Sequence, residues 1–227
     1  MEHKINSLLA TFKTTDAFGI ENAADFPPTS IGGQQFALVH AAVPQAGTLG
    51  AAQVSGGEQK DSGVLAKVAG RFHLRQDLLA ITDAVHSLVL MGTAGLDGKF
   101  HMPRSGGDQA LLNSARAFAA DAVAFQAQFV SLGLSSDFIT RLGTDISDFE
   151  LAIKVKGTGK GAQAAATGGL EDTAHKAAIA LHVLNTIVKN TYKNNPAKLA
   201  EWATASHVEK HTPAKRAKPA PAPAAQK

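Results

Sequence analysis

Three consecutive segments between Leu111 and Val188 carry apolar residues at alternating spacings of three and four. The stripes are Leu111, Ala115, Phe118, Ala122, Phe125, Phe129 and Leu132; Ile139, Leu142, Ile146, Phe149 and Ile153; and Leu170, Ala174, Ala177, Leu181, Leu184 and Val188. This spacing puts apolar side chains on one face of an α-helix and predicts helices that pack along that face. Because no stripe position is polar, a core built from these stripes has no buried side chain for catalysis or metal binding.

The rest of the chain also shows helix signals and few strand signals. Tyr and Trp occur once each, and no alternating apolar run lies between tight turns. Asn195-Pro196 is a typical helix start, with a capping side chain followed by proline at the first helical position. The sequence predicts an all-α antiparallel bundle of six to seven helices, near residues 3–24, 31–55, 59–91, 108–132, 136–156, 162–192 and 196–208.

Glycine and proline set the expected helix boundaries. Pro44 removes a backbone hydrogen bond and is expected to kink or break the helix at 31–55. The glycine-rich segments at 55–63 and 157–169 are predicted to be hairpin tips. A group of three predicted helices, in which the last connection is glycine-rich, then occurs twice, about a hundred residues apart. A duplicated three-helix unit is therefore one interpretation of the bundle.

The composition excludes several classes of protein. The chain has 227 residues, of which 44% are hydrophobic, enough for a substantial core. It has no cysteine, which excludes disulfides, thiolate metal sites and a cysteine nucleophile. The N-terminus lacks the apolar run of a signal peptide, and no run of eighteen apolar residues occurs. We therefore expect a cytoplasmic protein without a membrane span.

The positive charge of the chain is concentrated at its C-terminus. The net charge is +3 overall but +4 in residues 209–227, so residues 1–208 carry a net charge of −1. Alternating proline and alanine with scattered lysine cannot form a core and predicts a disordered tail at 210–227 after a helical domain at 1–209. The basic residues of the tail, which would give only weak electrostatic contacts, are Lys210, Lys215, Arg216, Lys218 and Lys227.

No motif predicts a catalytic residue, a cofactor or a metal. The pairs Asp83–His86 and Asp172–His175 have the spacing of bundle metal ligands, but both histidines fall beside the apolar stripe, toward the surface. The GTGKGA segment lacks the first glycine, the Ser or Thr after lysine and the preceding strand of a phosphate loop. His40, near the expected kink, is predicted to be a partly buried structural histidine; the alternative is a pocket residue.

The connection at residues 92–107 is long for a compact bundle, and such loops are often functional. Lys99, His101 and Arg104 precede the next helix, where free backbone N–H groups favour a small anion. The interpretation we favour is structural: Phe100, Met102 and Pro103 hold the loop against the bundle while the charges face water. Asp108, in the first helical turn, further opposes an anion there.

The sequence therefore favours a non-enzymatic helical scaffold or protein-interaction module, with a protein partner or self-association. Two alternatives remain open. One is a weak nucleic-acid-associated protein that acts through the basic tail. The other is a small-anion-binding bundle that uses the loop at 92–107.

Overall fold

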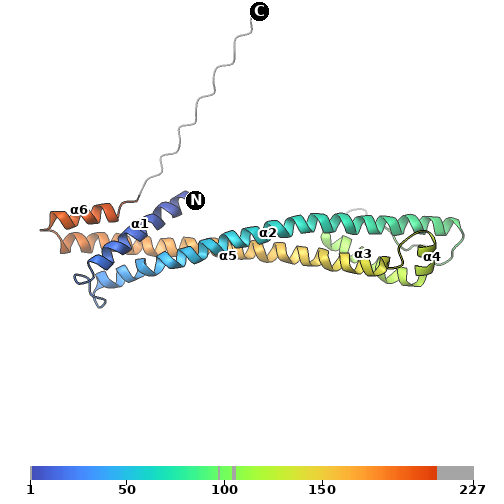
Figure 1. Ribbon diagram of the computed structural model, residues 1–227, viewed down its shortest axis with the longest axis horizontal. Helices are drawn as coiled ribbons and strands as arrows, with labels where there is room; N and C mark the ends of the chain where they lie inside the picture. The colour runs from blue at the N-terminus through green and yellow to red at the C-terminus, as the bar shows by residue number, and fades with distance from the viewer. Residues whose placement is uncertain (1, 97, 104–105, 209–227) are drawn as a thin grey trace, which may run out of the picture. The chain divides into compact units, whose positions relative to one another are not determined.

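The computed structural model describes residues 2–96, 98–103 and 106–208 (Figure 1). All regular structure in these residues is helical, which confirms the predicted all-α fold class. No helix in this part of the chain is both long and apolar enough to cross a lipid bilayer. The helices are α1 (Glu2–Glu21), α2 (Ile31–Leu90), α3 (Asp108–Ala122), the short 3₁₀-helix η1 (Val123–Phe125), α4 (Gln126–Ser131), α5 (Phe138–Thr191) and α6 (Pro196–Ala205).

The chain divides into two compact units, each with its own hydrophobic core. Unit 1 comprises Met1–Gly50 and Thr167–Lys227, and unit 2 comprises Ala51–Ala166. Helices α2 and α5 contribute to both units, because the boundaries fall inside them. Unit 1 also contains α1 and α6, whereas α3, η1 and α4 belong to unit 2.

The two predicted hairpin tips are wrong, because both glycine-rich segments lie inside continuous helices. Residues 55–63 belong to α2, and residues 157–169 belong to α5. The predicted helices at 31–55 and 59–91 are therefore one helix, as are those at 136–156 and 162–192. The six-to-seven-helix bundle and the duplicated three-helix unit, which depended on these tips, are not confirmed.

These glycines let two helix backbones of unit 2 approach closely. A Cβ atom on Gly56 would lie 2.6 Å from the backbone nitrogen of Gln163, and one on Gly63 would lie 2.7 Å from the Cα atom of Lys156. Because position 56 meets 163 and position 63 meets 156, the two helices are antiparallel in this unit. Small residues recur every seven positions on both: Gly56, Gly63 and Gly70 on α2, and Ala152, Gly159 and Ala166 on α5.

Two further parts of the helix prediction have different outcomes. The sequence predicts a kink or a break at Pro44; the break is wrong, because α2 continues as one helix from Ile31 to Leu90. Both Pro44 and His40 are exposed, so water can reach the part of the helix where the proline removes a hydrogen bond. The helix predicted at 108–132 is divided into α3, η1 and α4, with Phe125 outside the α-helical region at φ −119° and ψ 14°.

The core of unit 2 confirms the apolar stripes. On α2, the buried stripe comprises Leu74, Leu78, Ile81, Val85 and Leu88. It packs with Leu111, Phe118 and Phe129 from the next segment and with Leu142 and Phe149 from α5. Leu132, at the end of its stripe, is the exception, with 36% of its surface exposed.

The core of unit 1 is built around aromatic side chains. Trp202 of α6 is buried, and its ring centroid lies 5.2 Å from that of Phe18. Its indole Nε1 donates to Asn185 Oδ1 at 3.1 Å. Asn195 accepts a hydrogen bond from the backbone nitrogen of Lys198 at 3.2 Å, which confirms the predicted start of α6.

Candidate functional site

The crossover loop of unit 2 is stabilised by Phe100, whose side chain is buried. Its ring centroid lies 5.3 Å from that of Phe118 and 5.7 Å from that of Phe129, in edge-to-face geometry. The backbone at Phe100 has φ +58°, a left-handed conformation that costs energy for a bulky residue and that core burial compensates. Met102 packs against the same core. These contacts confirm that Phe100 and Met102 hold the loop in place.

The three residues predicted for an anion site do not share one set of surroundings in the structure. Lys99 Nζ lies 3.2 Å from Asp121 Oδ1 of α3 and 5.8 Å from the centre of the Phe125 ring. His101 is exposed. Arg104 lies outside the described residues, as do the tail residues Lys210, Lys215, Arg216, Lys218 and Lys227. Because Asp121 already pairs with Lys99, an anion would have to compete with a carboxylate for this lysine.

The first turn of α3 carries its own negative charge. Asp108 accepts contacts at both carboxylate oxygens, from Lys67 Nζ at 2.5 Å and from Arg71 Nη1 at 2.7 Å. Partial burial acts to raise the pKa of Asp108, but the hydrogen bonds and charges of Lys67 and Arg71 outweigh it and lower the pKa. The carboxylate therefore stays ionised beside the positive end of the helix dipole, where an anion would otherwise bind.

The histidines do not form a metal site in the described part of the chain. His86, His175 and His182 are exposed, as their position beside the apolar stripes predicts. No group of three or more His, Asp or Glu residues with metal-binding geometry occurs among the described residues. His40 is not partly buried as predicted: 66% of its side chain is exposed, because it reaches across the surface of unit 1 to Asp16 Oδ1 at 2.8 Å.

A carboxyl pair links α2 and α5 in unit 2. Asp77 and Asp145 line a hollow of about 460 Å³ together with His73 and Arg141. Burial, the hydrogen bond to the side chain of Asp145 and the charge of Asp145 raise the pKa of Asp77 to about 6. The charges of Arg141 and His73 act in the opposite direction and are weaker.

The Asp77 carboxyl group can therefore bind and release a proton near neutral pH. Its Oδ2 atom is buried and accepts no hydrogen bond from the residues that the structure describes. A hydrogen bond between two carboxyl groups needs one proton, so protonated Asp77 satisfies the pair, whereas ionised Asp77 places two like charges together. Such a group makes the stability of the helix pair depend on pH, and perturbed carboxyls of this kind are also candidates for acid–base chemistry.

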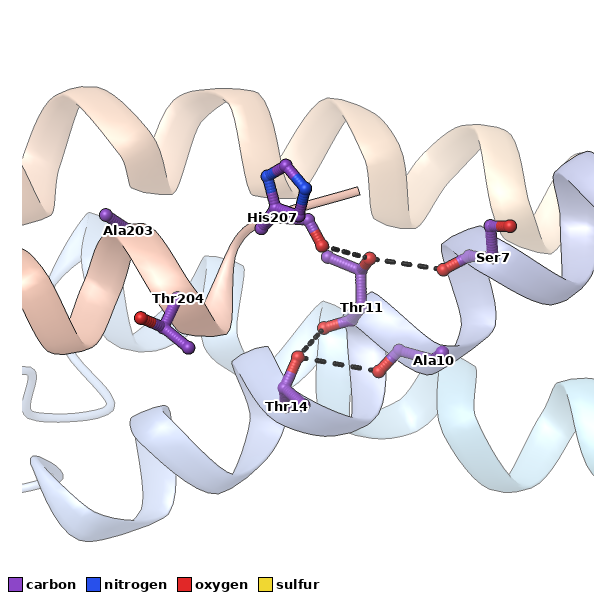
Figure 2. Close-up of a pocket in the computed structure, with 7 residues that line it drawn as sticks. All are labelled: Ser7, Ala10, Thr11, Thr14, Ala203, Thr204 and His207. Carbon is purple, nitrogen blue, oxygen red and sulfur yellow. Dashed lines mark hydrogen bonds between the residues drawn. The ribbon is translucent and has the colours of Figure 1, made fainter. Parts of the chain in front are cut away.

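A second hollow lies between α1 and α6 of unit 1 (Figure 2). It has a volume of about 490 Å³, and the hydroxyl groups of its threonines donate to backbone oxygens. Thr11 Oγ1 donates to the carbonyl oxygen of His207 at 2.9 Å, and Thr14 Oγ1 donates to that of Ala205 at 2.6 Å. These carbonyls, at and just beyond the last turn of α6, have no helical partner of their own. The threonines thus join two helices, and the described lining of the hollow contains no carboxylate, lysine or arginine.

The outer face of α2 in unit 2 is the most unusual surface of the described residues. Eight positions, which we call the outer stripe, follow one another at spacings of four and three on this face. Five of them are apolar and exposed: Leu65 at 74%, Val68 at 65%, Val54 at 61%, Phe72 at 60% and Leu79 at 40%. The other three are the exposed charged residues Glu58, Asp61 and Arg75.

The outer stripe lies opposite the buried stripe of the same helix. At 100° per residue, Phe72 and Leu65 are about half a turn away from the core residues Leu74 and Ile81. A surface helix is normally polar on the face away from its core. The described α2 segment of unit 2 is therefore apolar on two sides, and only one side is covered.

Sequence reasoning missed both the carboxyl pair and the outer stripe, although each had a signal. Asp77 directly precedes Leu78 of the buried stripe, and Asp145 directly precedes Ile146, which is buried on α5; both aspartates therefore lie at the edge of a helix interface. The outer stripe has the same periodicity as the buried one, but the expected hairpin tip at 55–63 interrupts it.

Comparison of the chain with family models, with curated proteins and with solved structures gives no match.

Proposed function

We propose that the chain is a non-enzymatic helical interaction module and that its binding surface is the outer stripe of α2. The observation that carries this proposal is the exposure of Leu65, Val68 and Phe72 on successive turns of one helix. Full burial of one such side chain is worth about 1.5–3 kcal/mol. A partner that covers three of them gains enough free energy to offset part of the entropy cost of association.

The stripe is not required by the core of unit 2, which supports its use for binding. The opposite face of α2 already provides Leu74, Leu78 and Ile81 to that core. Contiguous exposed apolar residues with charged neighbours are typical of protein interaction sites, and a helical stripe is typically bound by a second helix. A polar surface would serve the folding of this unit equally well.

Site-specific photo-cross-linking tests the proposal. A benzophenone amino acid placed at Val68 lies on the outer stripe, and the same amino acid at Lys154 of α5 is an exposed control in the same unit. The labelled full-length chain is irradiated in the cells that naturally produce it, and the adducts are identified by mass spectrometry. We expect a defined protein adduct from position 68 and none from position 154.

The change Phe72→Glu provides the second arm of this test. Phe72 is 60% exposed, so the variant should fold, which circular dichroism and thermal unfolding can verify. We expect it to abolish the adduct at position 68, because a charge is introduced into the centre of the apolar surface. Absence of any adduct from position 68, or an adduct that survives Phe72→Glu, would contradict the proposed function.

A further inference from the structure

The outer stripe of α2 has the spacing of a coiled-coil interface. Its positions follow one another at intervals of four, three, four, three, four, three and four residues without interruption. This alternation is the seven-residue repeat in which the first and fourth positions face a partner helix. The positions are Val54, Glu58, Asp61, Leu65, Val68, Phe72, Arg75 and Leu79. A surface with this repeat fits an α-helix that has the same repeat.

The stripe is complementary to itself when a second copy is reversed. In an antiparallel pair, a first position of one helix faces a fourth position of the other. When Leu65 lies opposite Val68 of the second copy, Val54 lies opposite Leu79. This follows because residue numbers rise along one helix as they fall along the other, so the two numbers of every facing pair have the same sum. Four of the five exposed apolar residues of the stripe thus face one another, and the two-fold axis produces each pair twice.

The charges of the stripe select this orientation. In the same antiparallel alignment, Glu58 faces Arg75 of the second copy, and this ion pair also occurs twice. Asp61 faces Phe72 of the second copy, and its carboxylate is already paired with Lys60 Nζ of its own helix at 3.2 Å. In a parallel pair each residue would face itself, with Glu58 against Glu58 and Arg75 against Arg75. Like charges placed opposite each other disfavour that arrangement.

We propose that the partner of the outer stripe is a second copy of this chain, bound antiparallel with Leu65 against Val68. This inference rests on the proposed function, because it names the occupant of the same surface. The interface is isologous, so both copies use the same residues, and it closes as a dimer without leaving a free outer stripe. The apolar pairs, the Glu58–Arg75 pairs and the mixed Asp61–Phe72 pairs together cover the stripe from Val54 to Leu79.

Cysteine cross-linking tests the alignment directly, because the chain has no cysteine of its own. The sites of Val54→Cys and Leu79→Cys lie 25 residues apart, which is about 38 Å along a helix. In the antiparallel pair, the thiol introduced at position 54 of one copy meets the thiol introduced at position 79 of the other. An equimolar mixture of the two variants should therefore form a disulfide-linked heterodimer under mild oxidation, whereas each variant alone should stay unlinked. A disulfide within either variant alone would show a parallel pair and overturn the proposal.

A charge exchange tests the same alignment without a covalent bond. Arg75→Glu places an acid against Glu58, and Glu58→Arg places two arginines together, so each single change should weaken the dimer about tenfold. The double variant Glu58→Arg/Arg75→Glu restores the opposite charges and should recover most of the affinity. Sedimentation equilibrium up to roughly 100 μM protein covers the weak end of the range expected for such interfaces. A double variant no better than the single ones would contradict the pairing.

The outcomes separate this inference from the proposed function. A wild-type chain that stays monomeric, with no heterodimer from the cysteine mixture, overturns self-association. If the benzophenone at position 68 then captures a different protein, the outer stripe is still an interaction surface and only its occupant is wrong. If neither experiment gives an adduct, both proposals fail.

Discussion

The change Asp77→Asn is expected to stabilise unit 2 at neutral and alkaline pH. Burial and the contact with Asp145 raise the pKa of Asp77 from 3.8 to about 6, so the folded protein holds this proton more tightly than the unfolded chain. The stability that the group contributes is complete below pH 3.8 and is lost as the pH rises through about 6. Asparagine stays neutral at every pH and can still donate a hydrogen bond to Asp145.

The size of the effect follows from the size of this pKa rise. Fully converted, it corresponds to about 3 kcal/mol between low and high pH. Asp77 is only partly buried, and solvent screening at such a position reduces the value to about 1–2 kcal/mol. We therefore expect Asp77→Asn to be more stable than the wild type by about 1–2 kcal/mol at pH 8. At about pH 4 the two proteins should be nearly equal.

Urea unfolding monitored by circular dichroism at pH 4, 6 and 8 measures this difference. Asp108→Asn is the matched control, because Lys67 and Arg71 lower the pKa of that carboxyl group. Its stabilising effect is present at high pH and is lost as the pH falls through the lowered pKa, so Asp108→Asn should be destabilising at pH 8. The two variants thus have opposite signs at pH 8. If Asp77→Asn were destabilising there, the carboxyl repulsion on which the argument depends would be absent.

Three further changes test the packing of the helices by thermal or urea unfolding. Gly63→Ala should destabilise unit 2, because the added Cβ meets the backbone of Lys156. Gly157→Ala is the control: its added Cβ has open space, so it should stabilise the helix by about 0.5–1 kcal/mol. Equal effects of the two changes on the free energy of unfolding would contradict the close helix contact. Phe100→Ala should cost about 3–5 kcal/mol, since the ring is buried against Phe118 and Phe129, and a smaller loss would show that the loop is not held by it. Asn195→Ala should cost about 1 kcal/mol through the lost cap of α6, and Asn195→Ser should recover most of it.

Most of the core could be predicted from the sequence, because helix periodicity depends on nearby residues alone. The spacing of Leu142, Ile146 and Phe149 places them on one face whatever they pack against, and all three are buried. The cap at Asn195 and the end of α4 near Gly133, at φ +96°, are equally local features. The carboxyl pair is different, since the pKa of Asp77 depends on Asp145, which is 68 residues away and on another helix.

The hairpin tips show why a glycine-rich segment has two interpretations. A glycine can end a helix by adopting a left-handed conformation, or it can remain helical and let another backbone approach. The residues around Gly56 do not distinguish these possibilities, because the deciding contact is made by Gln163. The distinguishing signal is joint: glycines at 56, 63 and 70 and small residues at 152, 159 and 166 both recur every seven positions. A turn has no reason to repeat at this interval, whereas two antiparallel helices in close contact require it on both sides.

The glycines and the outer stripe lie on opposite sides of the same segment of α2. Once residues 55–63 are helical, Glu58 and Asp61 are no longer loop charges but positions on a helix face, in register with Leu65, Val68 and Phe72. The inner side of this segment has glycines because a backbone lies against it, and the outer side has large apolar residues that stay exposed in the described part of the chain. Small residues on the covered side and large ones on the exposed side of one helix are the arrangement that the proposed partner helix would need, because such a helix would pack against side chains and not against a bare backbone.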